Sequence, residues 1–238
     1  MSADWATEFE ENGFTVIRGV ISREQIAHLR GVLEEAASAG KPHAIRNVLN
    51  RVPDVCRLAM GCGLVRLADE ALEGSAFVIR GLFFDKTPDA NWLVPWHQDL
   101  TIAVTERKDI AGFGPWSLKE GVTHVQPPEP WLSRRFAIRL HLDDCAEDNG
   151  PLRVLPGTHK LGRLSAGDIE RFRVERCEQQ ALVAAGDALV MSPMLLHASS
   201  AAAVPGHRRV IHLEYAADPP PTGMDWYEFA PGCVNSIL

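Results

Sequence analysis

The sequence predicts a mainly β protein with flanking α-helices, built around a double-stranded β-helix, the jelly-roll core of cupin-like proteins. Two observations predict this class. From Phe77 onward, short β-type runs alternate with glycine and aspartate turns, such as 148–151 and 186–187, a texture typical of an all-β barrel or double sheet. Before Phe77, apolar residues recur at helical spacing. We expect a single domain over 1–238, with a helical N-terminal part over about 1–75 and a β core over about 76–216.

The N-terminal part is expected to begin with a strand over 13–18. Ser22 then begins a helix, with Gln25 three residues later forming a capping box, and Gly40 followed by Pro42 ends it. A second helical stretch runs over about 53–72, where two glycines, at positions 61 and 63, argue against one continuous helix. We expect these helices to pack against the core and assign them no chemistry.

The β core is expected to consist of short strands joined by turns. The runs that predict strands are 77–80, 82–84, the stretch around His97, 136–142, 181–183, 188–191, 195–197 and 209–215. The stretch 112–130 is rich in Gly, Pro and Trp and is expected to be one long loop. Long loops in compact domains are often lids or binding loops.

Composition limits the classes of partner. The 24 Lys and Arg against 31 Asp and Glu give a net charge of −7, which argues against nucleic acid or an anionic membrane surface as the main partner. Five scattered cysteines without a C-x-x-C pair suit a reduced cytoplasm better than a disulfide framework. The first residues lack the pattern of a signal peptide, and no apolar stretch is long enough to span a bilayer. We therefore expect a cytoplasmic protein whose main partner is neither nucleic acid nor a membrane.

A metal site is indicated by His97, Asp99 and His197. Alternation along a strand places His97 and Asp99 on one face and Gln98 on the other, and a sheet can bring His197 to the same spot. Two imidazoles and one carboxylate on one side of a metal form the facial triad of non-haem Fe(II) oxygenases, which leaves the opposite side open.

A second H-x-D pair, His141 and Asp143, matches the tripeptide equally well. His97 precedes His197 by 100 residues, which leaves room for several strands between two walls of a barrel, whereas Asp143 runs directly into a turn-rich segment. These features favour the earlier pair, although any one histidine alone is more often a hydrogen-bonded core or surface residue.

Several motifs together resemble one family. They are the segments 95–99 (PWHQD), 142–144 (LDD), 149–152 (NGPL), 155–159 (LPGTH) and 197–199 (HAS), in that order over about 10–216. This order is similar to the phytanoyl-CoA dioxygenase family of Fe(II)- and 2-oxoglutarate-dependent oxygenases. The resemblance implies that His97, Asp99 and His197 bind iron. Related halogen-installing enzymes lack the acidic ligand, so the presence of Asp99 favours hydroxylation or another oxidative outcome.

The co-substrate 2-oxoglutarate needs a cation for its distal carboxylate, and the planar fork of arginine suits a carboxylate. An antiparallel return strand after the turn at 201–206 is expected to bring Arg208 or Arg209 back beside His197. Alternation places Arg208 toward the cavity and Arg209 on a packing face. The family places its arginine eleven residues after the distal histidine, which is Arg208, and the resemblance assigns Ser199 a hydroxyl contact with the co-substrate. A solvated basic turn is the alternative for Arg208, with Arg209 as its substitute.

Arg139 occupies a position where the family has an aromatic residue. A buried arginine needs an anionic partner, so Arg139 would contact 2-oxoglutarate, bind an acidic substrate or form an internal ion pair. For the substrate, Gln98 and Trp116 are the candidates. Weaker or structural assignments go to other aromatic and polar residues. Trp92, Trp96 and Phe113 would line the cavity or belong to the core, and Arg46 would reach the mouth of the site or, as the favoured alternative, lie at the surface. Lys86 is expected in a solvated turn, and His159 is expected to be a structural turn residue.

The sequence thus predicts an Fe(II)- and 2-oxoglutarate-dependent dioxygenase that uses O2, oxidises a small organic molecule and converts 2-oxoglutarate to succinate. The alternatives are a cupin-like metal- or ligand-binding protein without this activity, since fold alone does not fix function, and an iron oxygenase that needs no 2-oxoglutarate. The primary substrate, including whether it is a CoA thioester, and the oligomeric state cannot be read from the sequence.

Overall fold

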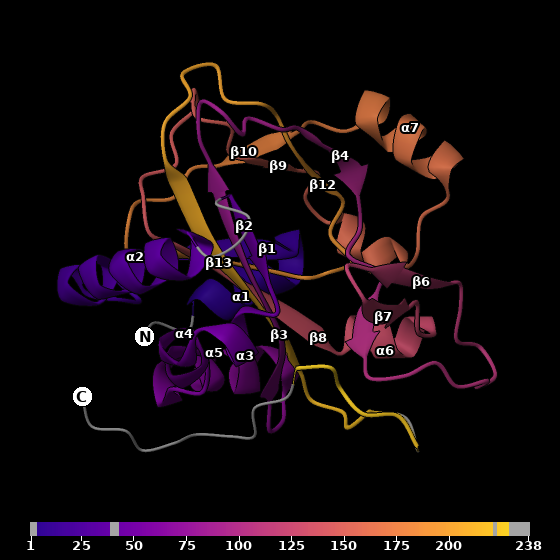
Figure 1. Ribbon diagram of the computed structural model, residues 1–238. Coiled ribbons are helices and arrows are strands. Elements are labelled where there is room, and N and C mark those ends of the chain that lie inside the picture. Colours follow the sequence, from indigo (N-terminus) through magenta and orange to yellow (C-terminus); the bar gives the residue numbers. More distant parts are fainter. Residues whose placement is uncertain (1–3, 39–42, 221–222, 229–238) are drawn as a thin grey trace.

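The computed structural model describes residues 4–38, 43–220 and 223–228, and two β-sheets form its centre (Figure 1). The larger sheet has the strand order β1-β11-β8-β13-β3-β2 and the smaller sheet the order β10-β9-β12-β4. The strands of the larger sheet are β1 (Phe14–Ile17), β2 (Ala44–Arg46), β3 (Phe77–Lys86), β8 (Arg135–His141), β11 (Ala188–Met191) and β13 (Arg208–Ala216). Those of the smaller sheet are β4 (Val94–His97), β9 (Leu152–Val154), β10 (Gln179–Ala181) and β12 (His197–Ser199). This arrangement confirms the predicted jelly-roll class.

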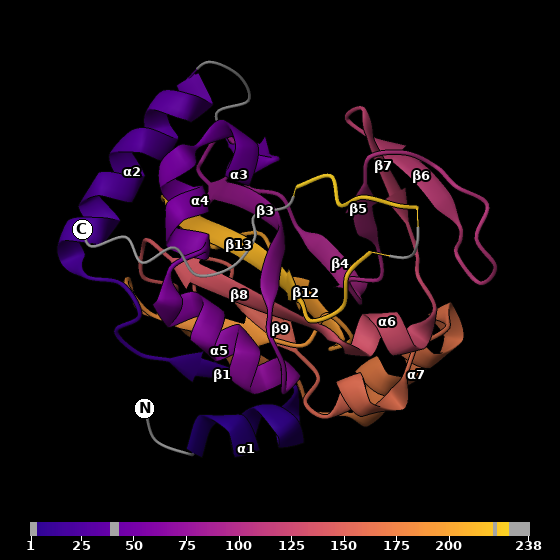
Figure 2. The same cartoon turned by 90° about the horizontal axis from the view of Figure 1, so that it is seen from below.

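Helices cover the outer face of the six-stranded sheet (Figures 1 and 2). They are α1 (Asp4–Asn12), α2 (Arg23–Ser38), α3 (Val48–Arg51), α4 (Pro53–Ala59) and α5 (Cys62–Leu72). Their apolar side chains form the main core with outward residues of β8 and β13, including Phe136, Ile138, Ile211 and Leu213. Burial of this apolar surface is the main force that holds helices and sheet together.

The N-terminal part also contributes strands. β1 pairs with β11 and β2 pairs with β3, so the stretch 1–75 adds both edge strands to the six-stranded sheet instead of forming a helical layer alone. The capping box at the start of α2 is confirmed, because the backbone N–H of Ser22 donates to the Gln25 side chain and the N–H of Gln25 donates to the Ser22 hydroxyl. The break near Gly61 is confirmed too, since α4 and α5 are separate helices. The predicted end of α2 at Gly40 and Pro42 lies outside the described residues.

The stretch 112–130 is not one long loop as predicted. It contains β6 (Trp116–Lys119) and β7 (Val122–Val125), which form a hairpin and build a three-stranded sheet with β5 (Ile102–Val104). The hairpin turn consists of Glu120 and Gly121, both at positive φ, 51° and 81°, the backbone that tight two-residue hairpin turns require. This small sheet stands at one end of the molecule beside α6 (Glu129–Ser133), and η1 (Thr158–Leu161) and α7 (Ala166–Glu175) follow β9 (Figure 1).

The two main sheets face each other. Their inner faces share a smaller apolar core at one end, formed by Ala137, Leu189 and Met191 of the larger sheet with Leu152 and Val154 of the smaller one. At the other end most of the inner side chains are polar, and they surround a cavity. No helix in the described part of the chain has the length and apolar character needed to cross a membrane.

Glu228 fastens the last described segment to the fold. Its carboxylate is 2% exposed and accepts hydrogen bonds from the backbone N–H of Gly81 at 2.7 Å and of Leu49 at 3.2 Å. Burial raises the pKa of Glu228 to about 7. Between the ordinary pKa of a glutamate and pH 7, the Glu228 carboxyl is ionised in the unfolded chain but keeps its proton in the folded chain. The free energy of unfolding therefore falls as the pH rises through this window.

We therefore expect a pH-dependent contribution of roughly 3 kcal/mol from Glu228. Glu228→Gln cannot ionise, and urea unfolding at pH 5 and pH 8 should show that wild type loses more stability over this interval than Glu228→Gln does. Glu147→Gln, at an exposed position, is the matched control and should behave as wild type. Equal pH dependence of wild type and Glu228→Gln would contradict the prediction.

Candidate metal and co-substrate site

His97 and His197 are brought together by strand pairing. β12 pairs antiparallel with β4, and His197 lies directly opposite His97 in this register. Residues opposite each other in an antiparallel pair have neighbouring side chains, and the two imidazole centroids are 4.2 Å apart. The sheet thus accounts for the meeting of two residues that are far apart in the sequence, as predicted.

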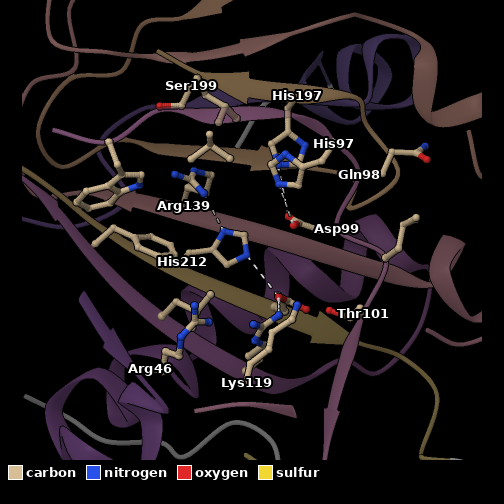
Figure 3. Close-up of a pocket in the computed structure, with 18 of the residues that line it drawn as sticks. Arg46, His97, Gln98, Asp99, Thr101, Lys119, Arg139, His197, Ser199 and His212 are labelled. Atoms are coloured by element: carbon tan, nitrogen blue, oxygen red, sulfur yellow. Dashed lines mark hydrogen bonds and ion pairs between the residues drawn. The ribbon is translucent and has the colours of Figure 1, made fainter. Parts of the chain in front are cut away.

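Asp99 joins the histidines from just outside the strand. β4 ends at His97, so strand alternation, the predicted reason for the common side of His97 and Asp99, does not hold; the backbone N–H of Asp99 instead donates to the carbonyl of Pro193 at 2.8 Å. The Asp99 oxygens lie 3.5 Å from His97 Nε2 and 3.6 Å from His197 Nε2. Figure 3 shows the three side chains converging while Gln98 points away.

Gln98 anchors this segment. Its amide nitrogen donates to the carbonyls of Met194 at 2.6 Å and Gly162 at 3.0 Å, and its oxygen accepts from the backbone N–H of Leu164 at 2.9 Å. The side chain is 7% exposed. Gln98 lines the cavity, but backbone groups engage both its amide nitrogen and its amide oxygen, and these bonds hold the segment that carries Asp99. Its contact with substrate stays a prediction.

The three side chains fit a metal ion. The Nδ1–H groups of His97 and His197 donate to the backbone carbonyls of Pro95 and Leu195, each at 2.8 Å, so both Nε2 lone pairs point toward Asp99. One ligand atom from each residue lies within 4.8 Å of the others. Burial lowers the pKa of His197 to about 4. Burial opposes ionisation of Asp99, but His197 and His97 hold its pKa well below the ordinary value. A neutral imidazole and an ionised carboxylate are the forms that bind metal.

The second H-x-D pair does not form such a site. The Asp143 carboxylate accepts from Arg30 at 2.6 Å and from Arg209 at 2.8 Å, and the His141 ring is buried without a hydrogen-bond partner among the described residues. Across residues 4–38, 43–220 and 223–228, His97, Asp99 and His197 are the one group with metal-ligand spacing.

Arg208 faces the cavity, whereas Arg209 faces away and pairs with Asp143, as strand alternation predicts. The route is different from the predicted one, because β13 pairs with β3 and β8 and not with β12. Arg208 therefore approaches the site from the opposite sheet. It is 4% exposed, donates to the carbonyl of Gly150, and its Nε has no hydrogen-bond partner in the described chain. The interpretation as a solvated basic turn is wrong.

Lys86, expected at the surface, is buried at 1% exposure. Its ammonium donates to the Ser199 hydroxyl at 2.6 Å and to the carbonyl of Ser200. Burial, then the charges of Arg208 and Arg139, lower its pKa to about 8. Ser199 lines the cavity. Lys86 and Arg208 are thus two buried cations near Ser199. Neither has a described carboxylate within ion-pair distance.

Arg139 also lines the cavity, and it forms no ion pair with a described carboxylate. One of its terminal nitrogens donates to His212 Nδ1 at 3.2 Å, which leaves the His212 Nε2–H toward Glu214, 3.6 Å away. Burial, reinforced by Arg208, lowers the pKa of Arg139 to about 10. The internal ion pair, one of the three alternatives for Arg139, is therefore not formed within the described part of the chain. The dashed lines in Figure 3 trace the contacts from Arg139 through His212 to Glu214.

The cavity has a volume of about 360 Å³, within the range of sites for small ligands. Trp116 is not among its lining residues. It begins β6 of the small sheet, and its ring lies 5.7 Å from the guanidinium of Arg107, so the predicted substrate contact is not supported. Trp92 lines the cavity, whereas Trp96 stacks under Arg153. The apolar lining residues are Leu82, Phe84, Trp92, Val94, Leu100 and Leu152.

Further polar lining residues were missed in the sequence. Arg80, Lys119, His212 and Glu214 line the cavity. Arg46 lines it too, so the less favoured of its two predicted positions, the mouth of the site, is the one observed. The alternation of β13 places His212 and Glu214 on the same face as Arg208, which is a signal that could have identified them. Arg80 and Lys119 gave no such signal, because their position depends on the pairing of β3 and on the unpredicted hairpin.

The sequence and the fold of this chain are similar to those of known proteins. The model of the family described as phytanoyl-CoA dioxygenase matches residues 9–210. The L-proline trans-4-hydroxylase of Streptomyces griseoviridis is 31% identical over 144 residues, which cover 60% of this chain and 44% of that relative. The match thus spans less than half the length of that curated relative.

Two solved structures have the same fold. EctD from S. alaskensis, in a structure with bound iron, aligns with a TM-score of 0.71 and 19% identity over 91% of this chain and 77% of its own. The non-heme α-ketoglutarate-dependent carbocyclase SnoK from nogalamycin biosynthesis aligns with a TM-score of 0.73 and 15% identity over 98% and 87%. At these identities the likeness shows the fold.

Proposed function

Because the chain belongs to the phytanoyl-CoA dioxygenase family, we propose that it is an Fe(II)- and 2-oxoglutarate-dependent dioxygenase acting on a small organic molecule. The observation that carries the proposal is the content of one cavity. One wall holds a His-Asp-His cluster, and another holds Arg208, a buried arginine that forms no ion pair with a described carboxylate. This arrangement suits an iron ion and a dicarboxylate that reaches from it.

His97, Asp99 and His197 would hold the iron. Their backbone-fixed rings and the ionised carboxylate provide a preorganised donor set on one side of the ion, which leaves the cavity side open for co-substrate, O2 and substrate. When bound, iron with 2-oxoglutarate and O2 supplies the oxidising chemistry, and 2-oxoglutarate leaves as succinate and CO2. The protein contributes ligand geometry and a cavity that limits access of water.

Arg208 would bind the distal carboxylate of 2-oxoglutarate. Its buried guanidinium has an unpartnered Nε, and a carboxylate accepts hydrogen bonds from such a fork with matching geometry. Lys86, held against Ser199, adds positive charge behind the same wall. Ser199 would contact the co-substrate through its hydroxyl. Arg139, which lines the cavity and forms no ion pair with a described carboxylate, would add a second arginine contact with the co-substrate. A buried charge without a counter-ion is costly, and a bound dicarboxylate removes this cost.

The reaction outcome and the setting are part of the proposal. Similarity to an L-proline trans-4-hydroxylase supports hydroxylation of a small molecule, and O2 is the second co-substrate. The free cysteines Cys56, Cys145 and Cys177 support a reducing compartment, which we take to be the cytoplasm.

The test is anaerobic addition of Fe(II) and 2-oxoglutarate. We expect a weak visible absorption band in wild type and in His28→Ala, an exposed histidine that pairs with Asp54, and no band in His97→Ala. Succinate release on admission of air, screened against a panel of metabolites, then identifies substrates. A wild-type enzyme that gives neither band nor succinate would favour a cupin-like binding protein.

A further inference from the structure

The cavity has a second cationic wall, distant from the arginine proposed for 2-oxoglutarate. Arg46 comes from β2, Arg80 from β3, and Lys119 from the end of β6 beside the hairpin turn. All three line the cavity, and Figure 3 shows Arg46 and Lys119 on the side opposite to the three proposed iron ligands. Three separate elements thus bring positive charge to the same wall.

Lys119 has no carboxylate within ion-pair distance in the described part of the chain. Its side chain is exposed at the cavity mouth. Partial burial there, and then the nearby charges of Arg80 and Arg46, lower the pKa of its ammonium. Arg46 has a partner, Glu120, at 3.3 Å, but both side chains are 40% or more exposed. An exposed pair of this kind contributes little free energy, so a bound ligand can replace it at small cost.

The acidic residues that line the cavity do not neutralise the positive charge of Arg46 and Lys119. Among the described lining residues the acids are Asp99, placed at the iron, and Glu214. Glu214 is 1% exposed and already accepts from Arg80 at 2.8 Å and Arg135 at 3.3 Å. Burial opposes its ionisation, but the charge of Arg80 and the neighbouring His212 and Arg135 lower the pKa of Glu214 to about 2. It is a fully engaged carboxylate and offers no site for a substrate amine.

On the basis of the proposed function, we infer that the primary substrate carries an oxyanion, a carboxylate or a phosphate ester, which binds Arg46 and Lys119 at the mouth of the cavity. Arg80, locked onto Glu214, adds positive potential behind them. The uncharged part of the substrate then lies along the cavity toward His97, Asp99 and His197. Such a contact selects by charge at one end of the molecule and leaves the other end to the reacting centre.

The test uses enzyme loaded anaerobically with Fe(II) and saturating 2-oxoglutarate, with the visible band confirming the load. Four ring compounds that differ in charge are then titrated: benzoate, phenyl phosphate, benzyl alcohol and benzylamine. Binding is read as a rise in the thermal unfolding midpoint and as a change of the band. We expect benzoate, phenyl phosphate or both to bind, with affinity that falls as NaCl is added, and the alcohol and amine to bind at least tenfold more weakly.

Charge-removing variants locate the contact. Lys119→Met and Arg46→Gln should each weaken binding of the anion about tenfold, and Lys119→Arg should restore most of it. Lys160→Met and Arg66→Gln remove the same side-chain types at exposed positions that do not line the cavity and should leave anion binding unchanged. Circular dichroism confirms that each variant is folded.

The outcomes separate this inference from the proposed function. Absence of the band in wild type overturns the proposed function itself. If the band forms, three results overturn the anionic substrate alone: none of the four compounds binds, the alcohol or amine binds as well as the anions, or the Arg46→Gln/Lys119→Met double variant binds the anions undiminished. The relative affinity for benzoate and phenyl phosphate tells which oxyanion the wall prefers.

Discussion

Asp99→Ala is expected to abolish iron-dependent turnover. Asp99 is the one carboxylate in the His97–Asp99–His197 cluster, and its oxygens lie between the two Nε2 atoms. Loss even of an outer partner of a metal ligand costs 10–100-fold in affinity or activity, so removal of a direct ligand should cost at least a hundredfold in Fe(II) affinity. Iron content after equilibrium dialysis, and succinate release with saturating 2-oxoglutarate, measure the two effects.

Two comparisons make this result specific. Asp109→Ala removes a carboxylate whose side chain is 96% exposed and should retain iron and activity. The segment that carries Asp99 is held by backbone hydrogen bonds and by Gln98, so Asp99→Ala should keep the thermal stability of the metal-free protein. Normal iron content in folded Asp99→Ala would contradict the assignment of Asp99 as an iron ligand.

Arg208→Met is expected to raise the KM for 2-oxoglutarate about a hundredfold. Each hydrogen bond to a charged group contributes about 1.5–3 kcal/mol, and the guanidinium is expected to give two of them to the distal carboxylate. Arg208→Lys keeps the charge but loses the fork, so its KM should lie between those of wild type and Arg208→Met. Steady-state succinate release at varied 2-oxoglutarate measures the effect.

The adjacent arginine is the matched control. Arg209 faces away from the cavity and pairs with Asp143 at 2.8 Å, so Arg209→Gln should lower the free energy of unfolding and leave the KM for 2-oxoglutarate as in wild type. The reverse pattern, a normal KM in Arg208→Met and a raised KM in Arg209→Gln, would contradict the prediction. It would place the co-substrate on the face of β13 that carries Arg209.

The predictable parts of the site follow from local rules. Alternation along β13 separates Arg208 from Arg209 whatever the strand pairs with, because side-chain period is a property of one strand. The turn at 149–150 was also predictable from its sequence, because it needs a glycine. Gly150 adopts φ 74°, and a Cβ there would lie 2.7 Å from the carbonyl oxygen of Ser200. The carbonyl of Gly150 accepts hydrogen bonds from Arg208 and from the Ser199 hydroxyl.

The unpredicted parts depend on partners distant in sequence. Lys86 is the last residue of β3 and precedes a turn, so nothing local indicates that its ammonium is buried and donates to Ser199 and Ser200. Arg80 meets Glu214 because these residues are opposite each other in the register of β3 and β13, which no single strand encodes. The hairpin that carries Lys119 lies in a segment rich in Gly, Pro and Trp. This composition is typical of loops, so the two short strands within the segment were not predicted.

The most direct test of the account is anomalous diffraction at the iron edge from crystals grown anaerobically with Fe(II) and 2-oxoglutarate. We expect one strong peak bonded to His97 Nε2, an Asp99 oxygen and His197 Nε2, with 2-oxoglutarate reaching from it to the Arg208 guanidinium. A peak at His141 and Asp143, or an empty His97–Asp99–His197 cluster under saturating Fe(II), would contradict it.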